Sequence, residues 1–232
     1  MADGLLFKPE EFSSTEQELQ KKWKTRKGQV WSIGDHSLVI GSATSIRFER
    51  GEGICTDPPF GMRVEELIAI FNKFAKVAVV LCDDRMAFDL DKHWRMRIDR
   101  IWVHNFPKWS VNRRMPIYYH AHVVVYTKTE SIPTGWTSKN SNSVIKVDGK
   151  PSKKMFGWGS NFGKPVRLFE EMLKGFEWKT FVDPFVGTGT SFIAAESLGK
   201  VCYGVEIDPV AAAIALERVT LYGLPKPKLL KA

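Results

Sequence analysis

The fold is decided by the stretch TFVDPFVGTGTSFIAAESLGKVCYGVEID, which runs from Thr180 to Asp208. An apolar run ends at Asp183 and leads through a Gly-x-Gly turn into a helical pattern over residues 191–198. A second apolar run covers 201–207. Strand, glycine turn, helix and strand form half of a doubly wound α/β fold, whose first turn binds nucleotides. Glycine in that turn lets the backbone approach a ligand closely, so the stretch predicts a nucleotide-like ligand.

Three further positions limit the chemical class of ligand that this motif could bind. Glu206 lies at the end of the second strand, where a carboxylate can accept hydrogen bonds from two ribose hydroxyls. The third glycine position of the dinucleotide pattern holds Phe192, and no lysine follows Gly189, which excludes a P-loop. The pattern therefore indicates an adenosine ligand without a large phosphate group.

Regular elements extend from this stretch toward both ends of the chain. Apolar spacing predicts strands over 29–33, 36–40, 53–56, 77–82, 97–103 and 121–126, and helices over 16–27, 64–75, 165–174 and 209–221. The continuous apolar run over 77–82 is typical of a strand buried on both faces of a parallel sheet. This alternation predicts an α/β fold with a mostly parallel sheet and helices on both faces. Residues 130–163 lack apolar periodicity and are expected to form an irregular loop.

A second motif, Asp57-Pro58-Pro59-Phe60, follows the strand over 53–56. The prolines end the strand and rigidify the turn, because proline has a fixed φ and no N–H. An amino group on a base has two N–H bonds, of which Asp57 can accept one and the Pro58 carbonyl the other. This arrangement would draw the nitrogen lone pair out of conjugation and aim it at a methyl donor. Phe60 can stack on the base, which must leave the duplex to be reached.

Both motifs resemble those of the amino-directed DNA methyltransferases. Residues 183–190 are similar to that family's S-adenosylmethionine-binding motif, and residues 161–165 resemble the segment that precedes it. Residues 57–60 resemble the family's catalytic motif, in which Asp-Pro-Pro-Tyr is commoner. The catalytic motif precedes the cofactor motif, which matches the permuted, beta-type order. The resemblance covers about residues 35–220.

The resemblance implies a Rossmann-like S-adenosylmethionine-dependent methyltransferase fold in a single domain, residues 1–232. The catalytic half would be 29–129, an inserted target-recognition loop 130–163, and the cofactor-binding half 164–222. Lys164 and Pro165 would border the methionine end of the cofactor. The implied catalytic residues are Asp57, Pro58, Pro59 and Phe60, and the implied cofactor-binding residues are Lys164, Pro165, Asp183, Pro184, Phe185, Gly187, Gly189, Thr190, Glu206 and Asp208.

The leading prediction is methylation of adenine N6 in double-stranded DNA, as in restriction–modification. Cytosine N4 stays open, although enzymes of that specificity more often have Ser at the position of Asp57. Methylation of RNA or protein and a non-catalytic binding domain are further alternatives, and the basic, aromatic middle favours nucleic acid over protein. Cytosine-C5 chemistry needs a nucleophilic cysteine, and Cys55 is badly placed before Thr56 and the prolines. We therefore expect direct methyl transfer.

Positive charge is concentrated in two segments of a chain whose net charge is +8. Residues 91–114 contain seven Lys or Arg against two acids, interleaved with Trp94, Trp102, Phe106 and Trp109. Residues 139–164 contain six lysines and one acid. Such mixtures suit contact with phosphates and bases, or equally tryptophans in a core beneath solvated charges, and Trp102 is expected in the core. The DNA-binding candidates are Arg95, Arg97, Lys108, Arg113, Arg114, Lys139, Lys153 and Lys154.

The histidine and cysteine patterns argue against a metal. The three cysteines, at positions 55, 82 and 202, lie far apart and form no Cys-x-x-Cys pair, which argues against a disulfide scaffold and against zinc. His120 and His122 would share one face of a strand, but no carboxylate motif lies nearby in the sequence. Asp83 and Asp84 are expected to cap a turn or contact the cofactor. We therefore expect no metal.

Membrane association is not expected either. Charged residues interrupt every apolar run well before membrane-spanning length. The first ten residues contain acids and no long apolar core, unlike a signal peptide. A reducing, cytoplasmic setting in a bacterial or phage-infected cell is the expectation, and whether the chain forms a homodimer stays open.

Overall fold

The computed structural model describes residues 15–46, 51–59, 61–108, 118–129, 131, 133, 135–137, 141–147 and 163–232, apart from the side chains of 96, 97 and 106–108. These residues form one ten-stranded sheet in the order β10-β1-β2-β9-β8-β3-β4-β6-β5-β7. β1 and β6 run opposite to the other strands, so the sheet is mostly parallel, as predicted. The strands are β1 (Val30–Ile33), β2 (His36–Ile40), β3 (Gly53–Thr56), β4 (Val77–Cys82), β5 (Met96–Lys108), β6 (Tyr118–Thr127), β7 (Val144–Lys146), β8 (Thr180–Asp183), β9 (Val201–Glu206) and β10 (Lys228–Lys231).

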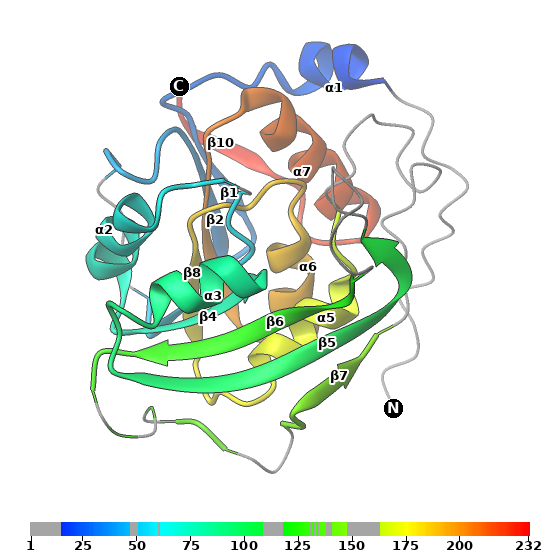
Figure 1. Cartoon of the computed structure of the whole chain (residues 1–232). Helices are drawn as coiled ribbons and strands as arrows, with labels where there is room; N and C mark the ends of the chain where they lie inside the picture. Colours follow the sequence, from blue (N-terminus) through cyan, green and yellow to red (C-terminus); the bar gives the residue numbers. More distant parts are fainter. Residues whose placement is uncertain are drawn as a thin grey trace.

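Helices cover both faces of this sheet, again as predicted (Figure 1). They are α1 (Glu16–Trp23), α2 (Val64–Phe74), α3 (Asp84–Leu90), α5 (Val166–Leu173), α6 (Thr190–Ser197) and α7 (Pro209–Leu221). The apolar sides of α5, α6 and α7 belong to one buried cluster, whereas those of α2 and α3 belong to a second. α1 packs on α7 through Leu19. In the described part of the chain, no helix has both the length and the apolar character needed to cross a membrane.

The predicted strands and helices around the two motifs are confirmed. β3 is buried along its whole length and stops where the two prolines begin. α7 begins where predicted, because Asp208 caps it by accepting a hydrogen bond from the Val210 N–H at 2.9 Å and Pro209 takes its first position. These local signals agree with the tertiary packing, which explains why they could be read from the sequence.

Three expectations about the extent or pairing of helices and strands need correction. The helix expected over 16–27 ends at Trp23, because Lys24 adopts a left-handed conformation with φ 52°. β4 is buried as predicted, but β6 pairs with it antiparallel, so its surroundings are not purely parallel. β5 and β6 are longer than the runs 97–103 and 121–126, and they lie side by side as a long antiparallel pair (Figure 1).

Part of the segment expected to be an irregular loop is ordered onto the sheet. β7 pairs in parallel with β5, and the side chains of Ile145 and Val147 are buried. The Trp102 indole N–H donates to the Val147 carbonyl at 3.1 Å. Three residues with alternating exposure are too short for a periodicity argument, which is why sequence reasoning missed β7. α3 and β10 were missed for the same reason of length.

The strand order places a topological switch in the middle of the sheet. From β8 the chain passes through α6 to β9 on one side, whereas from β3 it passes through α2 to β4 on the other. Ligands of open α/β sheets bind outside the carboxyl ends of the strands at such a point. The expected ligand site is therefore at the ends of β8 and β3, where the two sequence motifs begin.

Close packing of α6 on β9 depends on Gly204. A Cβ atom built at Gly204 would lie 2.4 Å from Val186 Cγ2 and 2.5 Å from Phe192 Cζ, so only glycine fits. In the dinucleotide pattern the third glycine allows helix and strand to approach closely. Here the helix position holds Phe192, and the strand supplies the glycine instead. This exchange explains how the motif departs from the dinucleotide pattern while keeping the same architecture.

Gly204→Ala should lower the free energy of unfolding by about 1–3 kcal/mol, because overpacking forces neighbours off their preferred rotamers. Urea denaturation followed by circular dichroism would measure the change. The double variant Gly204→Ala with Phe192→Leu should recover part of the loss, since leucine vacates the space of the ring edge. A single variant as stable as wild type would contradict this packing argument.

Candidate functional site

The two sequence motifs meet at the ends of neighbouring parallel strands. β3 pairs in register with β8, with Ile54 opposite Val182, so Asp57 and Asp183 leave the sheet at the same edge. The Thr56 hydroxyl donates to the Asp183 carboxylate at 2.6 Å, and the two residues are 127 positions apart in the sequence. This hydrogen bond is buried and joins the segment before the Asp-Pro-Pro turn to the start of the glycine loop.

Asp183 lies inside the domain, with 1% of its surface exposed. Its Oδ1 also accepts a hydrogen bond from the Phe185 N–H at 3.1 Å, which bends the chain into the loop. Burial raises the pKa of Asp183 from 3.8 to about 6, and the hydrogen bonds from Thr56 and Phe185 act in the opposite direction. The carboxylate therefore fixes the geometry of the loop from beneath.

The glycine loop needs both of its glycines. Gly187 has φ 54° and Gly189 has φ 82°, conformations that residues with a side chain rarely adopt. At Gly187 an added Cβ would meet no atom within 4 Å, so this part of the loop borders open space. At Gly189 the added Cβ would lie 3.1 Å from that of Ala215 on α7. The first glycine thus leaves the loop open toward a ligand, and the second lets it pack on the domain.

Glu206 joins the glycine loop to the start of α7. One carboxylate oxygen accepts from the Gly187 N–H at 2.7 Å and the other from the Asp208 N–H at 2.8 Å. Burial raises the pKa of Glu206, and these two N–H donors counteract the rise. Each oxygen keeps a second lone pair, so the carboxylate can still accept from a ligand hydroxyl. The exposed Ile207 follows directly and offers an apolar surface beside it.

Arg218 supports the same loop from α7, a role that sequence reasoning missed. Its guanidinium is buried and donates to the Thr188 carbonyl at 3.2 Å and to the hydroxyls of Thr188 and Thr190 at 3.0 and 2.7 Å. Burial lowers the pKa of Arg218, and Tyr222 counteracts that effect. The available signal was an arginine among the apolar residues of α7, on a helix that is buried over 212–219.

Lys164 connects the cofactor half to the Asp-Pro-Pro turn. Its ammonium group forms an ion pair with Asp57, and its backbone carbonyl accepts from the Thr190 hydroxyl at 3.3 Å. Pro165 follows as the residue that caps α5. A small cleft opens at this point, lined by Asp57, Pro58, Leu81, Cys82, Asp83, Met86, Ala121 and Lys164. The carboxylate expected to act on a base therefore lies in a cleft, and Lys164 connects it to Thr190, the first residue of α6.

Comparison with known proteins finds one curated relative and several solved structures. No protein-family model matches the chain. Over 209 residues it is 29% identical to the type II methyltransferase M.SmaI of Serratia marcescens, a match that covers 83% of this chain and 67% of that protein. The chain is therefore similar in sequence to a type II DNA methyltransferase.

Solved structures establish the fold of this chain. The complex of M1.HpyAVI with S-adenosylmethionine is 18% identical with a TM-score of 0.62, and the match covers 78% of this chain and 98% of that one. The PvuII DNA methyltransferase, described as cytosine-N4-specific, is 16% identical with a TM-score of 0.64, and the match covers 85% and 95%. The predicted Rossmann-like methyltransferase fold is confirmed.

The predicted site residues converge where they are described. The Asp-Pro-Pro turn, Lys164, the glycine loop and Glu206 gather around the carboxyl ends of β3, β8 and β9. Pro184 is buried in the loop, and Phe185 is half-buried. Phe60 lies outside the described residues.

The proposed DNA-contacting residues are described only in part. Arg95 is exposed, whereas Arg97 and Lys108 lie on β5 with side chains that are not described. Outside the described residues lie Arg113, Arg114, Lys139, Lys153 and Lys154.

Three residues of the basic, aromatic segment belong to the interior. The Trp94 ring is buried and packs edge-on against Phe71 and Tyr126. Trp102 is buried as well, as predicted. Arg100 is 2% exposed, and its guanidinium donates to the carbonyls of Asn142 and Glu171 at 2.9 and 2.8 Å. Arg100 therefore fastens the segment before β7 to α5, and neither of the two roles considered for the charges of this segment, phosphate contact or exposure to solvent, applies to it.

Arg218→Met should weaken binding of S-adenosylmethionine about 10-fold or more. Methionine keeps the apolar stem but leaves the Thr188 carbonyl without its charged donor, and one such bond is worth roughly 1.5–3 kcal/mol. Isothermal titration calorimetry would measure the affinity. Arg167→Met, which removes an exposed arginine of α5, is the matched control. Equal affinity in both variants would remove Arg218 from the support of the loop.

Asp183→Asn should become more stable relative to wild type as the pH rises from about 4 to about 6. In this window folded wild type holds a proton on Asp183 that the unfolded chain has lost, so wild-type stability falls with rising pH. Asparagine does not titrate, and its Oδ1 can still accept from Thr56 and Phe185. Urea denaturation across this range would test the trend, with the exposed Asp35→Asn as the surface control. A stability difference that stays constant with pH would contradict the raised pKa.

Proposed function

We propose that this chain is a methyltransferase that transfers the methyl group of S-adenosylmethionine to adenine N6 of a base flipped out of double-stranded DNA. The observation that carries the proposal is the position of the Asp57 carboxylate, in a cleft at the strand edge where the glycine loop of the cofactor half also begins. An amino group placed in this cleft would lie between an acceptor and the methyl donor. Asp57 in place of the serine commoner in cytosine-N4 enzymes favours adenine.

Asp57 and Pro58 are the residues that would orient the amino group. The buried Pro58 carries no N–H, so its own amide cannot compete for the acceptors at the turn. Asp57 accepts one amino N–H and the Pro58 carbonyl the other, which frees the nitrogen lone pair for attack. Lys164 neutralises the Asp57 carboxylate before the base arrives and holds it at the cleft. Substrate binding then requires the lysine to yield part of this contact.

The cofactor half supports S-adenosylmethionine by shape and by hydrogen bonding. Bound there, the cofactor supplies an electrophilic methyl group. Glu206 would accept from its ribose hydroxyls, and Ile207 would cover the face of its adenine ring. The open space at Gly187 fits a ligand that approaches the backbone closely. Lys164, Pro165, Asp183, Phe185, Thr190 and Asp208 complete the proposed cofactor site.

Cytosine N4 is the second candidate acceptor. Its exocyclic amino group has the same two N–H bonds as that of adenine, so Asp57 and Pro58 could orient either base. The PvuII enzyme, whose fold matches 85% of this chain, is cytosine-N4-specific. Identification of the methylated nucleoside separates the two candidates.

Recognition of the target sequence is proposed for residues 130–163, and phosphate contacts for the basic residues named above. A net charge of +8 supports a polyanionic partner, because neutralising phosphates supplies most non-specific affinity for DNA. The described residues 141–147 of this segment are attached to the core through Arg100 and β7.

Asp57→Ala should lower methyl transfer at least about 100-fold while leaving cofactor affinity within a few-fold of wild type. Glu206→Ala should show the opposite pattern, with a loss of cofactor affinity as the primary defect. The assay incubates each protein with labelled S-adenosylmethionine and unmethylated plasmid DNA, and then identifies the labelled nucleoside after digestion. We expect N6-methyladenine.

Three outcomes would count against the proposal. Label in N4-methylcytosine would favour the second candidate. Label in an RNA substrate but not in DNA would replace DNA as the substrate. Full activity of Asp57→Ala would remove that residue from catalysis.

A further inference from the structure

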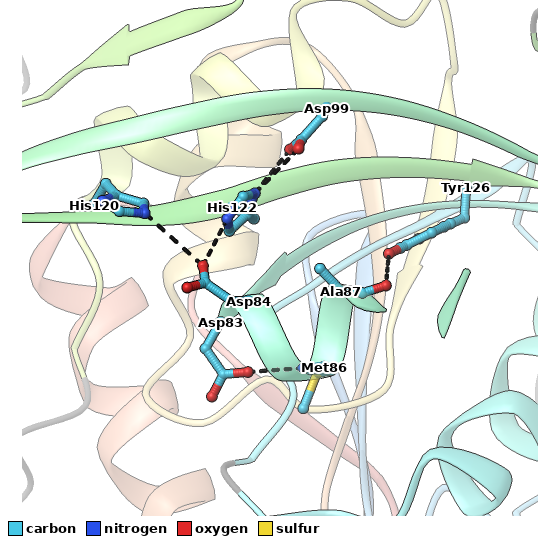
Figure 2. Close-up of polar contacts among 8 residues, drawn as sticks. All are labelled: Asp83, Asp84, Met86, Ala87, Asp99, His120, His122 and Tyr126. Atoms are coloured by element: carbon cyan, nitrogen blue, oxygen red, sulfur yellow. Dashed lines mark hydrogen bonds and ion pairs between the residues drawn. The ribbon is translucent and has the colours of Figure 1, made fainter. Parts of the chain in front are cut away.

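We propose that Asp84, His120 and His122 form a binding site for one divalent transition-metal ion, with zinc as the preferred ion. One ligand atom from each residue lies within 4.8 Å of the others. The His122 Nε2 atom is 2.7 Å from Asp84 Oδ1, and the His120 Nε2 atom is 3.8 Å from the same oxygen. The rings of the two histidines lie 5.7 Å apart. Figure 2 shows both imidazoles directed toward the Asp84 carboxylate.

The fold presets this arrangement. His120 and His122 are two positions apart on β6 and therefore point to the same face of the sheet. Asp84 is the first residue of α3, and Asp83 fixes that helix start by accepting from the Met86 N–H at 2.9 Å. The Tyr126 hydroxyl, farther along β6, donates to the Ala87 carbonyl of α3 at 2.8 Å. The Asp83 cap thus fixes the start of α3, and the Tyr126 hydrogen bond holds α3 against β6.

Asp99 completes the site from the neighbouring strand. Its carboxylate lies 3.0 Å from His122 Nδ1, so both ring nitrogens of His122 face a carboxylate. A neutral imidazole has one N–H and can satisfy only one of them. With the N–H directed to Asp99, the Nε2 lone pair faces Asp84, and a cation between these two atoms removes the repulsion. Carboxylates hold metal-bound histidines in this manner.

Ligand type selects the class of ion. Two imidazole nitrogens with one carboxylate oxygen suit zinc and similar transition metals, whereas magnesium and calcium prefer oxygen ligands throughout. Tetrahedral metal–ligand distances of about 2.0–2.2 Å place the ligand atoms roughly 3.4 Å apart, so His122 Nε2 and Asp84 Oδ1 must separate while His120 Nε2 moves closer to Asp84. The side chains of His120 and Asp84 are 38% and 57% exposed, which leaves them room to turn. Three protein ligands leave a coordination position open to water.

The fold brings two carboxylates next to the histidines, although no carboxylate lies near them in the sequence. We expected no metal because no carboxylate motif lies near the two histidines along the chain. Asp84 is 38 positions from His122 and Asp99 is 23 positions from it, and pairing of β6 with β4 and β5 brings them together. The site also borders the cleft that contains Asp57, since Asp83 and Ala121, neighbours of two ligands, line that cleft. A bound ion would clamp α3 to β6 at its edge.

The test is zinc binding by tag-free, chelator-treated protein, measured by equilibrium dialysis and calorimetry. Wild type should retain one zinc ion per chain and melt at a higher temperature when zinc is present. The double variant His120→Ala with His122→Ala should lose this ion and the thermal shift. Asp99→Asn should retain the ion with an affinity about 10–100-fold lower, as expected for the loss of a carboxylate that orients a ligand.

Controls separate this site from other zinc ligands on the chain. His93→Ala, which removes an exposed histidine outside the cluster, should bind zinc as wild type does. Cobalt substituted for zinc should give visible d–d bands without a thiolate charge-transfer band, which distinguishes ligation by the cluster from ligation by Cys82, the buried cysteine that pairs with His122 across β4 and β6. Circular dichroism of the zinc-free double variant should match wild type.

Two results would overturn the proposal. The first is unchanged zinc stoichiometry and affinity in the double histidine variant. The second is a wild-type chain that retains no zinc. Neither result depends on methyl transfer, so the proposed function is tested separately.

Discussion

The hydrogen bond between Thr56 and Asp183 is the constraint on which the site depends. It is short, buried and formed between the last residues of two parallel strands that the sequence separates by 127 positions. Through it, the Asp-Pro-Pro turn and the glycine loop take positions relative to each other that neither could specify alone. A buried carboxylate without such a donor would carry a large desolvation cost, so the pairing also limits the alternative arrangements of the two halves.

Polar groups beneath the glycine loop continue this constraint. Asp183 holds the loop at its start, Glu206 holds it at Gly187, and Arg218 holds it at Thr188 and Thr190. Each of these charged side chains is buried. Each forms hydrogen bonds with backbone groups or hydroxyls of the loop and its surroundings. Such networks rigidify a structure when their members are satisfied. The loop is thus preorganised for a ligand that it meets mainly through backbone atoms.

The sequence was informative where local and tertiary signals agree. Gly187, Gly189 and the two prolines after Asp57 are each associated with a particular backbone conformation. Their structural roles can therefore be predicted without knowledge of the fold. The burial of Trp94 and Arg100 could not be predicted, because charge and aromatic content look alike in a core and on a surface. Arg218 and the Asp84–His122 contact escaped notice because their partners become neighbours only through strand and helix pairing. β7 and α3 were not predicted because they are too short to show periodicity.

The strand order has a consequence for how the chain is assembled. β9 and β8 lie between β2 and β3, although they are synthesised long after both. The N-terminal portion therefore emerges with two unpaired strand edges that face a gap two strands wide, and exposed edges of this kind invite pairing with other chains. The sheet becomes continuous when β9 pairs with β2 and β8 pairs with β3. The catalytic and cofactor halves can therefore form a continuous sheet only after β8 and β9 have been synthesised.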